Sequence, residues 1–142
     1  MGKFSFKFSH EYFIALLPLF FVMHAVLENY GAVSFSDAFT LFLEYLLWLV
    51  LISISLGFLF RSLRKALLFT FFLGCFIFFF PSFHDWIKTS LENNFLTRYS
   101  ILLPLALMML IVTFIYLRRT KRPLRTMTIY LNVLLFALVL IE

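Results

Sequence analysis

Charged residues, glycine and cysteine are all scarce in this chain of 142 residues. Only 13% of the residues are charged and 63% are hydrophobic, so there is too little polar sequence to cover a soluble helical core. Four glycines leave no phosphate-binding loop and no nucleophile elbow, and the single cysteine, Cys75, can form no intrachain disulfide. These absences argue against a soluble domain and a self-contained active site, and we expect no catalytic residue, metal site or cofactor.

The plentiful residues are those that lipid tolerates. The chain has 22 phenylalanines, and each apolar residue lowers the free energy of membrane insertion by a few tenths of a kcal/mol. The formal net charge of +5 comes from basic residues in short clusters between apolar runs. No basic surface interleaved with aromatic residues is left for stacking bases. We therefore expect a membrane protein that does not bind nucleic acid.

Five apolar stretches predict an all-α polytopic membrane bundle of about five transmembrane helices, organised as a single domain over residues 1–142. A hydrocarbon core of ~30 Å needs about 20 helical residues, with roughly 17 as the lower limit. The second stretch, residues 38–60, is long enough to cross this core, and the other four are short for it. We expect Pro18 to kink the first helix and Pro81 to end the third. The predicted spans are residues 12–27, 38–60, 63–80, 101–117 and 127–141.

The distribution of lysine and arginine predicts the orientation. Lys88 and Arg98 are the only basic residues on one side of the predicted bundle, and ten lie on the other. Under the positive-inside rule, the N-terminus is cytoplasmic and, after five spans, the C-terminus is outside. The ten are Lys3, Lys7, Arg61, Arg64, Lys65, Arg118, Arg119, Lys121, Arg122 and Arg125.

The segment 81–100 is then an outer loop. We expect it to form a short amphipathic helix on the membrane, with Trp86, Ile87 and Leu91 facing the lipid. His84 and Asp85 are adjacent in this loop, which is not the helical spacing of metal ligands, and no third ligand is evident.

Three ionisable residues lie at membrane depth near the outer face: His24, Glu28 and Glu44. At ~1.5 Å per residue, His24 lies about 6 Å and Glu44 about 9 Å below the surface, on adjacent antiparallel helices. One interpretation is an outward-facing polar pocket, in which Glu44 pairs with His24 to hold a lipid headgroup or relay a proton. The other is structural: His24 and Glu44 hydrogen-bond to tie two helices together, and Glu28 lies at the interface.

Three phrases carry a resemblance to a known family: "LPLFFVMHAVLENYG", "LTRYSILLPL" and "YLNVLLFALVLIE". In order and pattern they resemble the N-terminal membrane region of bacterial sulfatase-like proteins of the alkaline phosphatase superfamily, such as lipoteichoic acid synthases and phosphoethanolamine transferases. The resemblance covers essentially the whole chain but includes no diagnostic chemical motif. It implies about five spans in the bacterial cytoplasmic (inner) membrane, followed by an extracytoplasmic catalytic domain. That domain carries the family's metal ligands and nucleophile, so no catalytic residue is transferred to this chain, and we interpret the end at Glu142 as that of a fragment or truncated product.

Three hypotheses follow. The first is a non-catalytic membrane anchor of a sulfatase-like hydrolase or phospho-headgroup transferase, which also serves as a platform for a lipid headgroup substrate. The second is a complete small membrane subunit that binds a partner membrane protein through phenylalanine-rich faces. The third is a minimal transporter or proton relay that uses His24, Glu28 and Glu44.

Overall fold

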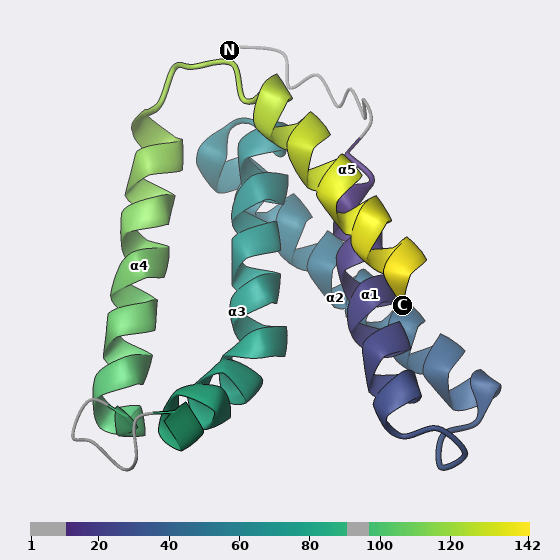
Figure 1. Cartoon of the computed structure of the whole chain (residues 1–142). Coiled ribbons are helices and arrows are strands. Elements are labelled where there is room, and N and C mark those ends of the chain that lie inside the picture. Colours follow the sequence, from purple (N-terminus) through teal and green to yellow (C-terminus); the bar gives the residue numbers. More distant parts are fainter. Residues whose placement is uncertain (1–10, 91–96) are drawn as a thin grey trace. The chain divides into compact units, whose positions relative to one another are not determined.

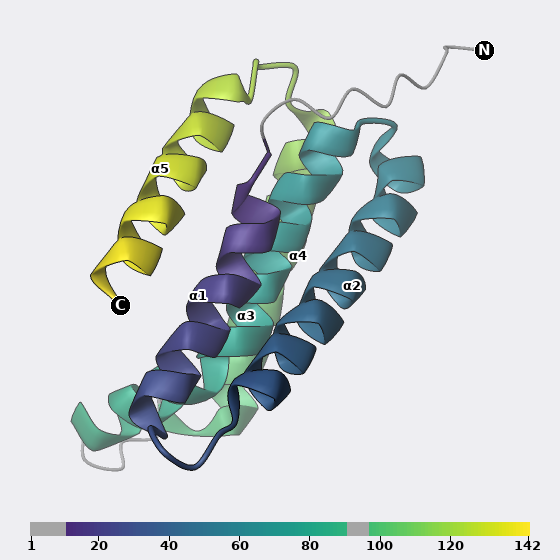
Figure 2. The same ribbon diagram turned by 90° about the vertical axis from the view of Figure 1, so that its right-hand side faces the viewer.

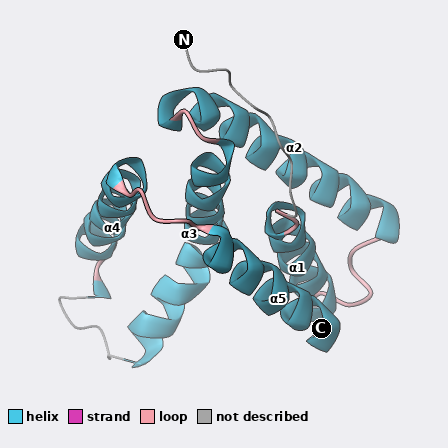
Figure 3. Cartoon of the chain, turned by 90° about the horizontal axis from the view of Figure 1, so that it is seen from above, coloured by secondary structure: helices cyan, strands magenta, loops and turns pink. Residues whose placement is uncertain are grey.

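The computed structural model describes residues 11–90 and 97–142, and this part of the chain consists of helices and loops (Figure 3). The prediction of an all-α fold is therefore confirmed. Three helices, α2, α3 and α4, are long and apolar enough to cross a membrane, and the other two, of 16 and 17 residues, are apolar but shorter. In chain order the helices are α1 (Phe13–Glu28), α2 (Phe35–Phe60), α3 (Leu63–Ser90), α4 (Tyr99–Arg119) and α5 (Arg125–Ile141) (Figure 1).

The turn between α1 and α2 has the chemistry expected from its sequence. Gly31 has a φ of 88°, a left-handed conformation that L side chains rarely adopt. Ser34 then caps α2: its Oγ accepts a hydrogen bond from the backbone N–H of Asp37 at 3.1 Å and donates to the Asp37 carboxylate at 2.7 Å.

Helix α3 corrects the prediction that Pro81 ends the third helix. Pro81 lies inside α3, which continues to Ser90, and the ribbon of α3 bends before its C-terminal end (Figure 1). A proline removes one helical hydrogen bond and displaces the carbonyl four residues earlier, so it can bend a helix without ending it. Much of the predicted outer loop is therefore the last part of α3. Trp86 is 65% exposed, while Leu91 lies outside the described residues, as do Lys3 and Lys7.

The helices divide into two compact units. The first consists of residues up to 71 and residues 121–142, and in it α1 lies between α2 and α5 and packs against both (Figure 2). Phe13 and Leu17 of α1 are fully buried, and the ring of Phe13 meets the ring of Phe71 edge-on at 5.6 Å. Between apolar helices in lipid, such packing is stabilised by van der Waals contacts, because it removes no apolar surface from water.

Two polar contacts fix the direction of α5 relative to α1. The backbone N–H of Phe13 donates to Oδ1 of Asn132 at 2.7 Å, and Nδ1 of His24 lies 2.9 Å from Oε1 of Glu142. The sequence separations of these pairs are 119 and 118 residues, so the two helices run in the same direction with almost constant register. Glu142 therefore lies at the level of His24, one turn before α1 ends at Glu28.

The second unit comprises residues 72–120, which form the rest of α3 and the whole of α4. His84 and Thr97 are buried in it, at 5% exposure each. Helix α4 exposes large apolar side chains over several turns, including Leu105, Met109 and Val112. An exposed apolar helix of this length is typical of a segment surrounded by lipid.

Candidate functional site

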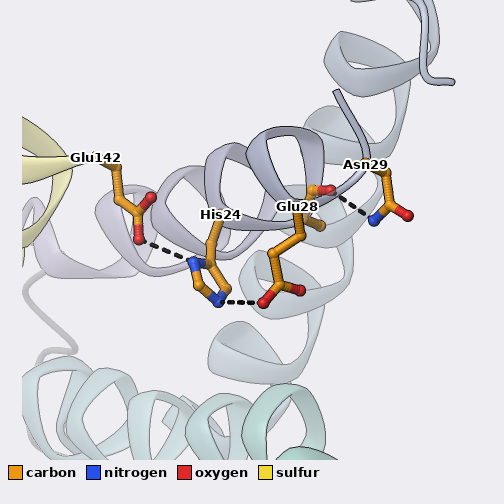
Figure 4. A network of polar contacts seen from close by, with 5 residues as sticks. His24, Glu28, Asn29 and Glu142 are labelled. Atoms are coloured by element: carbon orange, nitrogen blue, oxygen red, sulfur yellow. Dashed lines mark hydrogen bonds and ion pairs between the residues drawn. The ribbon is translucent and has the colours of Figure 1, made fainter. Parts of the chain in front are cut away.

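The imidazole of His24 lies between two carboxylates. Its Nδ1 is 2.9 Å from Oε1 of Glu142, and its Nε2 is 3.4 Å from Oε1 of Glu28, which lies one turn later on the same helix (Figure 4). We call His24, Glu28 and Glu142 the polar cluster. Its side chains are exposed to different degrees: 45% for His24, 67% for Glu28 and 20% for Glu142. Glu142 is therefore the most enclosed charge of the cluster.

Both ring nitrogens of His24 face carboxylate oxygens. The contact of Nδ1 with Glu142 has the length of a hydrogen bond, and the contact of Nε2 with Glu28 is longer. The ring of Phe20 stacks on the imidazole with centroids 6.0 Å apart and planes 16° apart.

Glu28 lies at the C-terminal end of α1. The C-terminal end of a helix carries a partial negative charge, which disfavours a carboxylate there. The imidazole of His24 faces Glu28 from one turn earlier on the helix. Asn29 satisfies one of the terminal carbonyls, since its side-chain amide and its backbone N–H both donate to the carbonyl of Ala25, at 2.8 and 3.2 Å (Figure 4).

Glu44 does not join this cluster. It is exposed on α2 and makes no hydrogen bond or ion pair within residues 11–90 and 97–142, so the predicted contact between His24 and Glu44 is absent. The contact between His24 and Glu44 was predicted from depth alone, but a contact also requires that both side chains lie on the facing sides of their helices. Tyr45, the next residue, faces α1, and its ring packs against Phe21 at 5.8 Å. Because adjacent residues point about 100° apart on a helix, Glu44 points away from this contact.

Glu142 is the residue that the predicted pocket lacked. Its acidic side chain at the end of the last apolar run is visible in the sequence, but its contact with α1 depends on the long-range pairing of α1 with α5. No local pattern predicts which helices of a bundle become neighbours. Glu142 therefore could be placed at the right depth but not beside His24.

An apolar groove of about 350 Å³ adjoins the polar cluster. It lies between the second half of α1 and the first two turns of α2, and its lining residues recur at intervals of three and four on each helix, so each helix contributes one face. Glu142 is the single ionisable residue in the lining. The other lining residues are Leu19, Val22, Met23, Val26 and Leu27 of α1, with Phe35, Ala38, Phe39 and Phe42 of α2.

A second histidine, His84, has a different environment in the second unit. Its Nε2 lies 3.0 Å from the carbonyl oxygen of Thr97, its Nδ1 lies 3.2 Å from Oδ1 of Asp85, and its ring stacks on Tyr99 at 3.6 Å. These contacts tie the last part of α3 to the start of α4. In the described ranges no group of three His, Cys, Asp or Glu side chains is placed to hold a metal ion.

A third polar contact lies at the other end of α1. Nε of Arg64, at the start of α3, donates to Oε1 of Glu11 at 3.1 Å. The Glu11 side chain is only 3% exposed and that of Arg64 is 37% exposed. The pair joins the chain ahead of α1 to α3, and its burial fits a structural role.

Comparison with known proteins provides no relative. No family model, curated protein or solved structure matches the chain.

Proposed function

We propose that this chain is the membrane anchor of a sulfatase-like hydrolase or phospho-headgroup transferase, and a platform on which lipid substrate approaches an extracytoplasmic catalytic domain. In this proposal the chain itself is not catalytic. It rests on the resemblance of three sequence phrases and on the apolar helices α2, α3 and α4, each long enough to cross a membrane.

The structural observation that most supports the proposal is that α1 and α5 run in the same direction. Helices that cross a membrane in the same direction are separated by an even number of chain reversals, as expected for the first and fifth spans. At ~1.5 Å per residue, α1 and α5 are about 24 and 26 Å long, a few ångströms short of a ~30 Å hydrocarbon core. Local thinning of the bilayer at modest cost can close that gap.

Two experiments test the anchor. The first reads the coding sequence beyond Glu142 for a sulfatase-like domain, and an immediate native stop codon would exclude the anchor hypothesis. The second measures topology in a cysteine-free background, with Cys75 replaced by alanine, by labelling Tyr30→Cys and Ser62→Cys in intact cells with a membrane-impermeant maleimide. We expect Tyr30→Cys, in the turn before α2, to be labelled and Ser62→Cys, in the turn before α3, to be protected. The opposite labelling would refute the orientation.

A proton relay is a second candidate, because the imidazole of His24 lies between two carboxylates, hydrogen-bonded to Glu142 at 2.9 Å and 3.4 Å from Glu28. The geometry supports His24, Glu28 and Glu142 as its members in place of the predicted set with Glu44. Proton flux into vesicles that contain the purified chain tests it directly. A relay requires flux in the parent chain that falls in Glu142→Gln and remains in Glu44→Gln.

A further inference from the structure

The polar cluster holds more negative charge than its histidine can balance. Glu28 and Glu142 flank a single imidazole, so one negative charge remains when both carboxylates are ionised and His24 is protonated, and two remain when His24 is neutral. Within residues 11–90 and 97–142, neither carboxylate pairs with a lysine or arginine. Ionised groups within a membrane are costly and are usually paired with a group of opposite charge. The cluster therefore has room for one further cation.

The depth of Glu142 restricts where that cation comes from. Glu142 lies at the level of His24, which is four residues, or about 6 Å, before the end of α1. Its side chain is 20% exposed and forms part of the wall of the apolar groove. A lysine or arginine on a neighbouring transmembrane helix reaches this depth, because its apolar stem lies along the helix while its charged end extends toward the surface.

The groove has dimensions that suit one face of a helix. Its lining on α1 runs from Leu19 to Leu27, about 12 Å at ~1.5 Å per residue, which is about two helical turns. Helices pack by placing the ridge of side chains of one helix in the groove that another presents. Ala38 is the smallest residue in the lining, and small residues let helices in lipid approach closely.

We propose that this groove is the docking site for a transmembrane helix of a partner membrane protein, and that this helix carries a lysine or arginine near the membrane surface, which pairs with Glu142 and Glu28. The groove supplies van der Waals contact, and the carboxylates select a partner with a cation at the matching depth. His24 positions Glu142 through the 2.9 Å contact with Nδ1. The inference goes beyond the proposed function and shares with it only that α1 and α2 lie in a membrane.

Energy transfer to synthetic helices tests the charge requirement. The full chain, with Cys75→Ala and a donor dye on Tyr30→Cys in the turn that joins α1 to α2, is placed in dioleoyl phosphatidylcholine vesicles. Two helices of leucine and alanine, each of about 20 residues, carry an acceptor dye at one end and either lysine or glutamine one turn from that end. We expect the lysine helix to associate about fivefold or more tightly than the glutamine helix, as one polar contact within the membrane allows. Equal association of the two helices would overturn the proposal.

Two matched substitutions assign the preference to the polar cluster. Glu142→Gln should abolish the preference for the lysine helix. Glu44→Gln, the same change at an exposed residue of α2 outside the lining, should leave the preference intact. A preference that survives Glu142→Gln would show that the cation pairs elsewhere, and the assignment of Glu142 would be wrong.

A second pair of variants tests the groove itself. Leu27→Trp at the rim of the groove should weaken association of both helices, whereas Leu140→Trp, at an exposed position on α5 outside the lining, should not. Unchanged association in Leu27→Trp would exclude the groove as the docking site.

A last measurement separates a partner helix from a second copy of this chain. Donor-labelled and acceptor-labelled chains are mixed in the same vesicles, and we expect no energy transfer beyond that of random proximity. Transfer that Leu27→Trp removes would assign the groove to a second copy and would overturn the proposal. None of these measurements uses a following catalytic domain, so their failure is distinguishable from failure of the anchor hypothesis.

Discussion

Replacing either member of the Glu11–Arg64 pair removes the same ion pair, yet the two substitutions should differ sharply in cost. Arg64→Met leaves the carboxylate of Glu11 without its guanidinium partner at a position where only 3% of the side chain is exposed. Glu11→Gln leaves a guanidinium that is 37% exposed and can turn toward water. Removing one partner of a buried ion pair costs about 3–5 kcal/mol. Because Arg64 is partly exposed, we expect about 2–4 kcal/mol for Arg64→Met and about 1 kcal/mol or less for Glu11→Gln.

The assay is unfolding of the purified chain in a mixed-detergent titration, followed by far-UV circular dichroism. Arg119→Met, which removes an exposed arginine at the end of α4, serves as the matched control and should change the free energy of unfolding by less than about 0.5 kcal/mol. The double variant Glu11→Leu with Arg64→Met should be more stable than Arg64→Met alone, because it removes the buried carboxylate as well. Equal costs for Arg64→Met and Glu11→Gln would refute the asymmetry.

Three further outcomes follow from single contacts. Gly31→Ala should cost about 1 kcal/mol because φ is 88°. Gly57→Ala, in helical backbone where the new Cβ would meet nothing within 4 Å beyond the adjacent backbone of its own helix, should stabilise by about 0.5–1 kcal/mol; both are read from the same unfolding titration. Asn132→Leu removes the acceptor for the buried N–H of Phe13 and should cost about 1–3 kcal/mol. Thr128→Val, which removes a hydroxyl that donates to the carbonyl of Leu124 at the start of the same helix, should cost less than about 1 kcal/mol, and similar costs would contradict the role of Asn132. Glu44→Gln should leave the free energy of unfolding within about 0.5 kcal/mol of the parent value, and a larger loss would reveal a contact that Glu44 makes in the folded chain.

The sequence predicted the helices better than their ends. Hydropathy located all five helices, because a continuous apolar run must be buried in protein or lie in lipid, whichever helices pack beside it. The cap at the start of α2 is local chemistry between Ser34 and Asp37, which lie three residues apart in the sequence. Pro81 was misread because the rule that proline ends a helix describes the loss of one hydrogen bond, and α3 tolerates that loss within its run to Ser90.

The candidate site combines one contact within a helix, which local sequence predicts, with one between helices, which it does not. His24 and Glu28 are four residues apart, which places them on one face of one helix, and their contact follows from this local spacing. The third member depends on which helix lies beside α1 and on the side of the helix that each residue occupies. Depth alone led to Glu44 as the predicted partner of His24, whereas the packing of α1 against α5 brings Glu142 beside it.

The pairing of α1 with α5 has a consequence for how the protein is made. Helix α1 is synthesised first, but the oxygen that accepts from its first-turn N–H belongs to Asn132, which leaves the ribosome more than a hundred residues later. Until then, the face of α1 that packs against α5 is uncovered, and another helix or a chaperone of the insertion machinery can bind there. Biogenesis of this unit is therefore completed from its last segment, and a ribosome stalled before α5 would leave α1 exposed to quality control.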